Sequence, residues 1–257
     1  MTDEWVSLCG RISSMKSVAV SFSGGVDSTV VLAAAAEALP CHHIAVFADV
    51  PMLSERQRRI AHEILDSLGT DSVTVKLGWD DMPGVRDNNA DRCYRCKKAI
   101  YSAVRNVAGE NGYRVCADGE NFSDRTEDRP GRRAAAEYEI VSPLRDLGIR
   151  RDAVRKMCDA LPLNVRIVKE TCMATRLPLG TPFGNSEIHM IEECEDLIRS
   201  VSGVRQIRMR VRDGSAALLA SPSETELLIR KEKELASLLA EKGIGNIAID
   251  PDGYREE

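Results

Sequence analysis

Residues 21–28 read Ser-Phe-Ser-Gly-Gly-Val-Asp-Ser; they follow an apolar, β-branched run and lead directly into an alanine-rich segment. This order predicts a strand, a glycine turn and the start of a helix, an arrangement that binds phosphate. Gly24 and Gly25 let the backbone approach an anion, and the first helical turn offers unpaired N–H groups. Ser23 and Ser28 add hydroxyl donors. The stretch has no Walker lysine, so it is not the phosphate loop of kinases and GTPases.

Strand and helix patterns alternate along the first 180 residues. After the strand that precedes the glycine turn, the pattern predicts helices at 26–38, 54–68, 91–108 and 151–161 and strands at 43–48, 73–77 and 113–117. Ser54-x-x-Gln57 is a capping box at the start of the second of these helices. Such alternation predicts an α/β domain over residues 1–180, with a parallel sheet covered by helices on both faces and ligands at the carboxyl ends of the strands.

Four polar or glycine positions follow predicted strands and are expected to line the same crevice as the glycine turn: Asp49, Gly119, Glu120 and Asn121. Beyond residue 181 the pattern changes, and we expect a helix at 186–200, strands at 205–212 and 216–220, a long charged helix at 225–242 and a strand at 246–250. This order predicts a small C-terminal α+β domain over residues 181–257, with helices on one face. The long helix is expected to start with Ser221 as cap, Pro222 at the first helical position and Glu224 reaching back.

The composition is that of an ordinary soluble protein, with 43% hydrophobic and 29% charged residues. No apolar run approaches the roughly 20 residues of a membrane span, and the N-terminus lacks signal-peptide character, so we expect a cytoplasmic protein without membrane contact. The formal charge of −5 disfavours nucleic acid as a partner. In a reducing compartment, the eight cysteines favour thiol, metal or catalytic roles over disulfides.

Three cysteines stand out. Cys93 and Cys96 lie three positions apart on a predicted helix, so both thiols can point to one side. Cys172 lies in a loop between Lys169 and Arg176, and because nearby cations lower a thiol pKa, it is a candidate nucleophile. The remaining five are expected to be small core residues: Cys9, Cys41, Cys116, Cys158 and Cys194.

The glycine stretch resembles the SGGxDS signature of the PP-loop ATP pyrophosphatases, which have an adenine nucleotide hydrolase-like fold. The resemblance implies that ATP is split between its α and β phosphates, that a substrate oxygen is adenylated and that pyrophosphate leaves from this loop. The implied nucleotide-binding residues are Ser23, Gly24, Gly25, Val26, Asp27, Ser28 and Gly119. The metal that serves ATP is expected to be Mg²⁺, which commonly bridges nucleotide phosphates.

Further motifs resemble those of LarE-type sulfur transferases within this superfamily, and together they cover most of the chain. They are Asp91-Arg92-Cys93-Tyr94-x-Cys96-Lys97, Asp118-Gly119-x-Asn121, Asp128-Arg129-Pro130-Gly131, Ser142-Pro143-Leu144, Cys172-Met173-Ala174-Thr175-Arg176 and Arg208-Met209-Arg210. Strand alternation also puts Arg212 on the same face as Arg208 and Arg210. Guanidiniums so arranged suit a substrate phosphate, and we expect Arg176, Arg208 and Arg210 to bind it.

The resemblance implies a role in nickel-pincer nucleotide biosynthesis: pyridinium-3,5-biscarboxylic acid mononucleotide is adenylated on a carboxylate and converted to the thiocarboxylate. In the sacrificial version, the cysteine that matches Cys172 attacks, forms a thioester and is left as dehydroalanine. Here Cys93, Cys96 and Cys172 form a possible trio, and three thiolates can hold three irons of a 4Fe-4S cluster whose fourth iron carries a sulfide. A tetrahedral zinc site would need a fourth ligand that the sequence does not identify.

Two other classes of function stay open. A tRNA thiolase would use the same adenylation chemistry, but the acidic composition and the lack of a recognisable RNA-binding module argue against it. A non-catalytic adenine-nucleotide sensor would have no use for Cys172 between cationic neighbours. By likeness to the family, the chain is expected to assemble into a homo-oligomer, as a trimer or hexamer.

Overall fold

The computed structural model describes residues 2–123, 130–167 and 170–254. The chain forms two compact units, one of Met1–Val85 with Asp91–Lys169 and one of Arg86–Ala90 with Glu170–Glu257. The short segment Arg86–Ala90 groups with the second unit, a division that no single boundary along the chain describes. The domain boundary at residue 180 stays a prediction.

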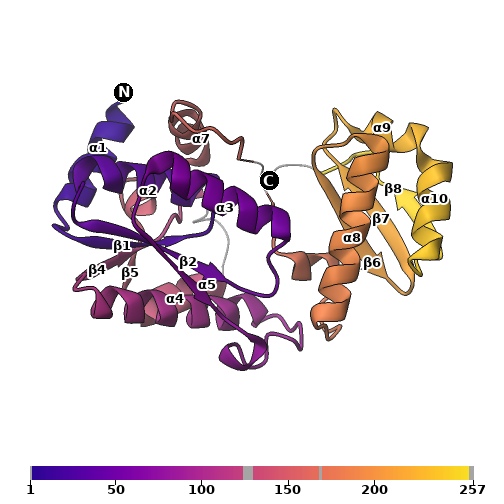
Figure 1. Cartoon of the computed structure of the whole chain (residues 1–257), viewed down its shortest axis with the longest axis horizontal. Coiled ribbons are helices and arrows are strands. Elements are labelled where there is room, and N and C mark those ends of the chain that lie inside the picture. Colours follow the sequence, from indigo (N-terminus) through magenta and orange to yellow (C-terminus); the bar gives the residue numbers. More distant parts are fainter. Residues whose placement is uncertain (1, 124–129, 168–169, 255–257) are drawn as a thin grey trace. The chain divides into compact units, whose positions relative to one another are not determined.

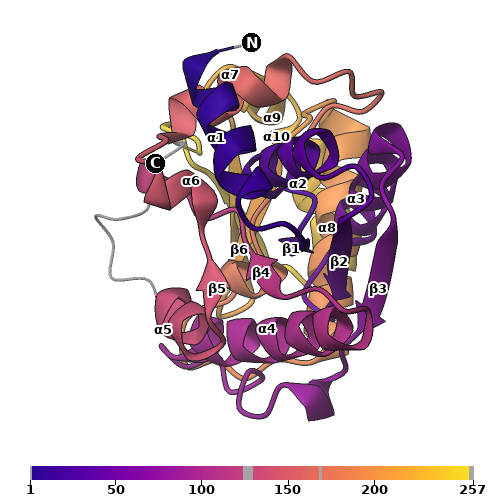
Figure 2. The same cartoon turned by 90° about the vertical axis from the view of Figure 1, so that its left-hand side faces the viewer.

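The first unit is built on a five-stranded parallel sheet (Figures 1 and 2). Its strands are β1 (Val18–Phe22), β2 (His43–Asp49), β3 (Ser72–Lys76), β4 (Val115–Ala117) and β5 (Ile140–Val141), in the order β3-β2-β1-β4-β5. All four pairings are parallel. The predicted α/β fold with a parallel sheet is confirmed. The chain adds β2 and β3 on one side of β1 and then β4 and β5 on the other, so the order reverses between β1 and β4, where such sheets bind ligands.

Helices cover both faces of this sheet (Figure 2). They are α1 (Asp3–Ser13), α2 (Val26–Ala38), α3 (Glu55–Leu68), α4 (Arg92–Glu110), α5 (Pro130–Glu137), α6 (Pro143–Asp146) and α7 (Arg151–Asp159), with a short 3₁₀ turn at Trp79–Asp81. Because side chains alternate along a strand, Val18 and Val20 pack with α1, α2 and α7, whereas Ala19 packs with α4 and α5. The strand β1 is therefore buried on both faces.

The local signals of the first unit predict most of its elements. The helix predicted at 26–38 is confirmed, and α3 begins after Ser54 with the expected capping box to Gln57. The helices α5 and α6 and the strand β5 were not predicted, since each spans too few residues for a hydrophobic period to show. No helix in the described ranges combines the length and the apolar character that crossing a bilayer requires.

The second unit contains a three-stranded mixed sheet in the order β6-β7-β8. Its elements are a 3₁₀ turn, η3 (Met173–Arg176), then α8 (Asn185–Ser202), β6 (Ile207–Arg212), β7 (Ser215–Ala220), α9 (Thr225–Arg230), α10 (Glu232–Glu241) and β8 (Asn246–Ile249). The strand β7 pairs antiparallel with β6 and parallel with β8. The predicted small α+β unit is confirmed.

The prediction of one long helix at 225–242 is wrong, because the chain forms two helices, α9 and α10, that are separated at Lys231. The predicted cap is wrong as well: Ser221 makes a turn in which its carbonyl accepts from Glu224 N, and α9 starts only after Glu224. The Glu224 carboxylate accepts from Arg205 Nε at 2.6 Å and from Arg205 N at 3.2 Å instead of reaching back to Ser221. A partner distant in sequence therefore overrides the local capping signal.

Candidate active site

The glycine turn connects β1 to α2 as a hydrogen-bonded loop. Gly24 has a φ of +74°, a conformation that glycine adopts without steric cost, and Gly25 is the extended N-cap of α2. Ser28 Oγ accepts from Ser23 N at 3.2 Å, lies 3.1 Å from Ser23 Oγ and donates to Gly25 O at 3.1 Å. The two serines thus hold the loop in one shape at the helix N-terminus, where Val26 and Asp27 begin the first turn.

Two neighbouring segments fit against this loop so closely that glycine is needed. A Cβ on Gly119, which follows β4, would lie 2.5 Å from Ser28 N and 2.8 Å from Asp27 C, both backbone atoms. A Cβ on Gly24 would lie 2.9 Å from Ala61 Cβ on α3. The glycine loop is therefore packed between the end of β4 and α3.

The turn after β4 is held by a buried carboxylate. Asp118 accepts from Tyr101 Oη at 2.6 Å, from Ser142 Oγ at 2.8 Å and from Glu120 N at 3.1 Å. Burial and then the Asp118 charge raise the pKa of Tyr101, so its hydroxyl stays a donor. Asn121 completes the connection, since its Nδ2 donates to Asp27 Oδ1 at 2.9 Å.

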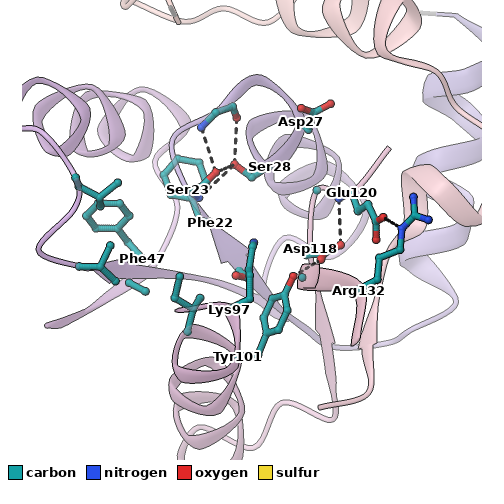
Figure 3. A pocket seen from close by; sticks show the side chains of 18 residues that line it. Phe22, Ser23, Asp27, Ser28, Phe47, Lys97, Tyr101, Asp118, Glu120 and Arg132 are labelled. Carbon is teal, nitrogen blue, oxygen red and sulfur yellow. Dashed lines mark hydrogen bonds and ion pairs between the residues drawn. The ribbon is translucent and has the colours of Figure 1, made fainter. Parts of the chain in front are cut away.

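A pocket with a cavity volume of about 350 Å³ opens beside the loop, at the carboxyl ends of β1, β2 and β4 (Figure 3). Phe47 lies on one side of the pocket in Figure 3, and Glu120 with Arg132 lies on the other, with Ser23 and Ser28 between them. Three further apolar residues also line the pocket: Ala48, Val50 and Leu53. One side thus suits a flat apolar ring, and the loop and charged side suit phosphate.

The charged side of the pocket contains a carboxylate between two guanidiniums. Glu120 accepts from Arg132 Nε at 2.5 Å and from Arg145 Nη1 at 2.9 Å. Lys97, from α4, also lines the pocket, and its Nζ lies 5.0 Å from the centroid of the Tyr101 ring. Lys97 and Arg132 therefore supply positive charge next to the glycine loop.

Of the residues expected to line the crevice, Gly119 and Glu120 do so. Asp49 is instead paired with Arg58 Nε at 2.6 Å, and Asn121 is buried under the loop. The sequence reasoning missed Lys97, Tyr101, Asp118 and Arg132 as pocket residues. Lys97 and Asp118 lie inside motifs already recognised, and that is the signal that could have found them.

The thiols of Cys93 and Cys96 belong to the first turns of α4, where Cys93 is exposed and Cys96 half-buried. Arg92 Nη2 lies 3.8 Å from Cys93 Sγ. No three His, Cys, Asp or Glu side chains gather as a metal site within residues 2–123, 130–167 and 170–254. Cys172 belongs to the second unit.

Cys172 is the half-buried N-cap of the turn η3, which an internal ion pair holds in place. Arg176 Nε donates to Glu195 Oε1 at 2.8 Å, and Arg176 Nη1 donates to Thr171 O at 3.0 Å. Arg176 is 2% exposed and Glu195 is 1% exposed. Three elements meet at this pair, because Glu195 on α8 also accepts from Met209 N on β6. Arg176 therefore positions the Cys172 turn; its role toward a phosphate stays a prediction.

The other predicted phosphate ligands lie on β6. Arg208 is half-buried and stacks on the ring of Tyr254, with its Cζ 3.4 Å from the ring centroid. Its Nη2 is buried and has no hydrogen-bond partner in the described part of the chain. Arg210 is exposed on the same strand. Among the arginines that strand alternation predicts to share one face of β6, Arg208 thus has a guanidinium nitrogen without a partner in the described residues.

Several residues that the sequence singled out lie outside the candidate site or outside the described residues. Lys169, Asp128 and Arg129 lie outside the described residues. Of the five cysteines expected in the core, Cys116, Cys158 and Cys194 are buried, and Cys9 is half-buried. The prediction is wrong for Cys41, which is exposed in the turn before β2.

Comparison with known proteins defines the class. The family model described as asparagine synthase matches residues 7–93, which include the glycine loop, α2, β2 and α3. With the parallel sheet and the SGGxDS loop, this match makes residues 7–93 similar to an asparagine synthase-like PP-loop ATP pyrophosphatase domain. Members of this class are typically ATP-dependent adenylating enzymes.

Other known proteins are similar to this chain over nearly its whole length. Pyridinium-3,5-bisthiocarboxylic acid mononucleotide synthase of Lactiplantibacillus plantarum is 27% identical over 97% of this chain and 91% of its own length. Uncharacterized proteins of Methanocaldococcus jannaschii and Synechocystis are each 27% identical, over 93% and 92% of this chain and 91% and 89% of theirs. The resemblance to LarE-type sulfur transferases drawn from the motifs is confirmed.

Proposed function

We propose that this chain is an ATP-dependent sulfur transferase that adenylates a carboxylate of pyridinium-3,5-biscarboxylic acid mononucleotide and converts it to the thiocarboxylate. The observation that carries the proposal is the similarity to the synthase of this chemistry over 97% of the chain, glycine loop and Cys172 turn included. The pocket beside the loop is lined by apolar residues that suit the adenine ring, and Lys97 and Arg132 add positive charge for the phosphates.

In the first step, ATP binds with its adenine against Phe47 and its phosphates at the N–H groups of residues 23–28. A substrate carboxylate oxygen attacks the α-phosphorus, the bond to the β-phosphate oxygen breaks, and pyrophosphate leaves. Lys97 and Arg132 stabilise the negative charge that develops on the leaving pyrophosphate. Asp27 offers a carboxylate to the Mg²⁺ that arrives with the phosphates.

In the second step, sulfur attacks the acyl carbon, the acyl–oxygen bond breaks, and AMP leaves with the electron pair. In the sacrificial version the nucleophile is the Cys172 thiolate. The resulting thioester then loses the Cys172 Cα proton and breaks its Cβ–S bond, so the thiocarboxylate departs and dehydroalanine remains.

The cysteine trio supports a second source of the sulfur. Cys93 and Cys96, three positions apart on α4, suit two irons of a 4Fe-4S cluster, and Cys172 would hold a third. The cluster would supply a sulfide on the iron that no protein thiolate holds. The protein would then keep Cys172 intact over many turnovers.

We assign the binding of the substrate phosphate to arginines of the second unit. Arg208 and Arg210 lie on β6, where Arg208 Nη2 has no hydrogen-bond partner in the described residues. Arg176 stays in the proposed set, and its guanidinium also donates to Glu195 and to the Cys172 turn. We retain a homo-oligomer, trimer or hexamer, as the expected assembly.

The deciding experiment incubates the purified protein with the pyridinium biscarboxylate mononucleotide, ATP and Mg²⁺, and measures AMP, pyrophosphate and thiocarboxylate by mass spectrometry. We expect all three from the wild type, and pyrophosphate without thiocarboxylate from Cys172→Ser. Cys41→Ser, which removes an exposed thiol outside the trio, is the matched control. Unaltered ATP would refute the enzyme and favour a nucleotide sensor. Thiolation of tRNA without thiolation of the mononucleotide would favour the thiolase.

The source of sulfur is decided on protein purified without oxygen. Under the cluster hypothesis the protein contains iron and labile sulfide, Cys93→Ser loses both, and the chain mass is unchanged after turnover. Under the sacrificial hypothesis iron is absent, Cys93→Ser keeps one turnover, and the chain loses the mass of one hydrogen sulfide. The two sets of results exclude each other.

A further inference from the structure

The C-terminal turn after β8 is built onto the sheet of the second unit. Asp250 N donates to Leu218 O at 3.0 Å, and Tyr254 N donates to Ala220 O at 2.5 Å. Gly253, between them, has a φ of +62°, and a Cβ there would lie 2.7 Å from Ala220 O. This turn therefore has one conformation that fits against β7, and it fixes the position of Tyr254.

Tyr254 uses this position to cover one face of Arg208. Tyr254 is 7% exposed, and Arg208 Cζ lies 3.4 Å from the centroid of its ring. Arg208 lies on β6 and pairs with Leu219 on β7, the strand to which the turn is bonded. Stacking on an aromatic face leaves the edge of a guanidinium open for hydrogen bonds.

That edge includes a buried nitrogen, Arg208 Nη2. Arg208 Nη2 is buried and has no hydrogen-bond partner among the described residues, and a buried donor left in this state is costly. Burial lowers the pKa of Arg208; Tyr254 opposes this effect, and the charges of Arg176 and Arg210 add to it. The Glu195 carboxylate, whose Oε1 lies 2.8 Å from Arg176 Nε, neutralises the charge of Arg176. An incoming dianion would satisfy Nη2 and offset the positive charge.

We propose that Tyr254 is a positioning and specificity residue: its ring holds Arg208 flat so that the Nη2 edge meets the phosphomonoester of the substrate. This proposal rests on the proposed function for the identity of the substrate, but the phosphate selectivity can be measured without turnover. It makes the site selective for a phosphorylated nucleotide over the corresponding nucleoside. The proposal assigns this role to the ring of Tyr254, whose centroid lies 3.4 Å from Arg208 Cζ.

The test is calorimetric titration, without ATP, with nicotinic acid mononucleotide and with its dephosphorylated riboside. We expect the wild type to prefer the mononucleotide and Tyr254→Leu to weaken its binding about tenfold, as loss of a desolvated cation–π contact predicts. The riboside should bind equally to both proteins. Tyr254→Phe, which keeps the ring, should stay within about threefold of the wild type. Tyr113→Leu, at a half-buried tyrosine of the first unit, is the matched control.

Arg208→Lys provides an independent check if Tyr254→Leu does not fold. Lysine keeps the charge but has neither the planar stack nor the forked edge, so mononucleotide binding should fall about as far as in Tyr254→Leu. Wild-type binding by either variant, or equal binding of mononucleotide and riboside by the wild type, overturns the proposal. If phosphate selectivity depends on Tyr254 while no thiocarboxylate forms from the biscarboxylate, the proposal stands and the proposed function fails. In an active enzyme, Tyr254→Leu should raise KM for the mononucleotide more than it lowers kcat.

Discussion

Arg176 and Glu195 form a two-point ion pair in which Nε lies 2.8 Å from Oε1 and Nη2 lies 3.3 Å from Oε2, with both side chains almost fully buried. The same guanidinium donates to the backbone of the Cys172 turn. Breaking such a pair from one side leaves an uncompensated buried charge. The conformation of the turn that carries Cys172 therefore depends on a carboxylate 23 positions further along the chain.

We predict that Glu195→Gln lowers the unfolding free energy by about 3 to 5 kcal/mol, since Arg176 keeps its charge without the carboxylate. Urea denaturation measures the change. The matched control is Glu226→Gln, which breaks an exposed pair with Arg230 at 3.2 Å and should cost about 0 to 1 kcal/mol. Similar losses in the two variants would show that burial does not set the strength of the Arg176 pair.

The close approach of Gly119 to Ser28 gives a second prediction. Gly119→Ala should weaken ATP binding at least about tenfold, because its Cβ would lie 2.5 Å from a backbone nitrogen and would force the glycine loop to move. Fluorescent ATP-analogue titration measures the affinity. Gly109→Ala, in α4 with no atom within 4 Å of the added Cβ, should leave affinity unchanged and stabilise the helix by up to about 1 kcal/mol.

Asn121 connects β4 to α2 through the Asp27 carboxylate at 2.9 Å. Replacing it with Ala should raise KM for ATP several-fold, because Asp27 loses the donor that orients it in the pocket. Steady-state pyrophosphate release measures KM. Asn111→Ala removes an asparagine amide that donates to Val107 O at 2.8 Å at the end of α4, and it should not change KM. An Asn121→Ala enzyme with normal KM would show that Asp27 needs no such support.

Glu224 predicts a dependence of stability on pH. Burial raises its pKa, but the bonds from Arg205 and from the backbone N–H groups of Gln206 and Arg205 outweigh burial, and the net shift is downward. A lowered pKa in the folded state adds stability above the ordinary value of 4.5, and this stability is lost as pH falls below it. The unfolding free energy of Glu224→Gln should therefore fall less steeply below pH 4.5 than that of the wild type. Glu232→Gln, at an exposed carboxylate, controls for the loss of one acidic group.

Local sequence patterns were sufficient to predict the features of this protein that depend on neighbouring residues. The glycine turn, the helix over 26–38 and the capping box at Ser54 follow from local chemistry, because backbone freedom and hydrophobic period act within a few residues. The parallel sheet followed from the repetition of such signals. The cysteine motifs and the resemblance also came from short stretches of sequence.

The contacts between residues that are distant in sequence could be seen only in the folded chain. Asn121 bonds to Asp27 across 94 positions, and Arg208 stacks on Tyr254 from a different element. Arg205 draws Glu224 away from the cap that its spacing predicted. The fold also sets the exposure of each side chain: it buries Arg176 and leaves Cys41 exposed. A local pattern states what a side chain can do, and the partner that the fold places beside it selects among those options.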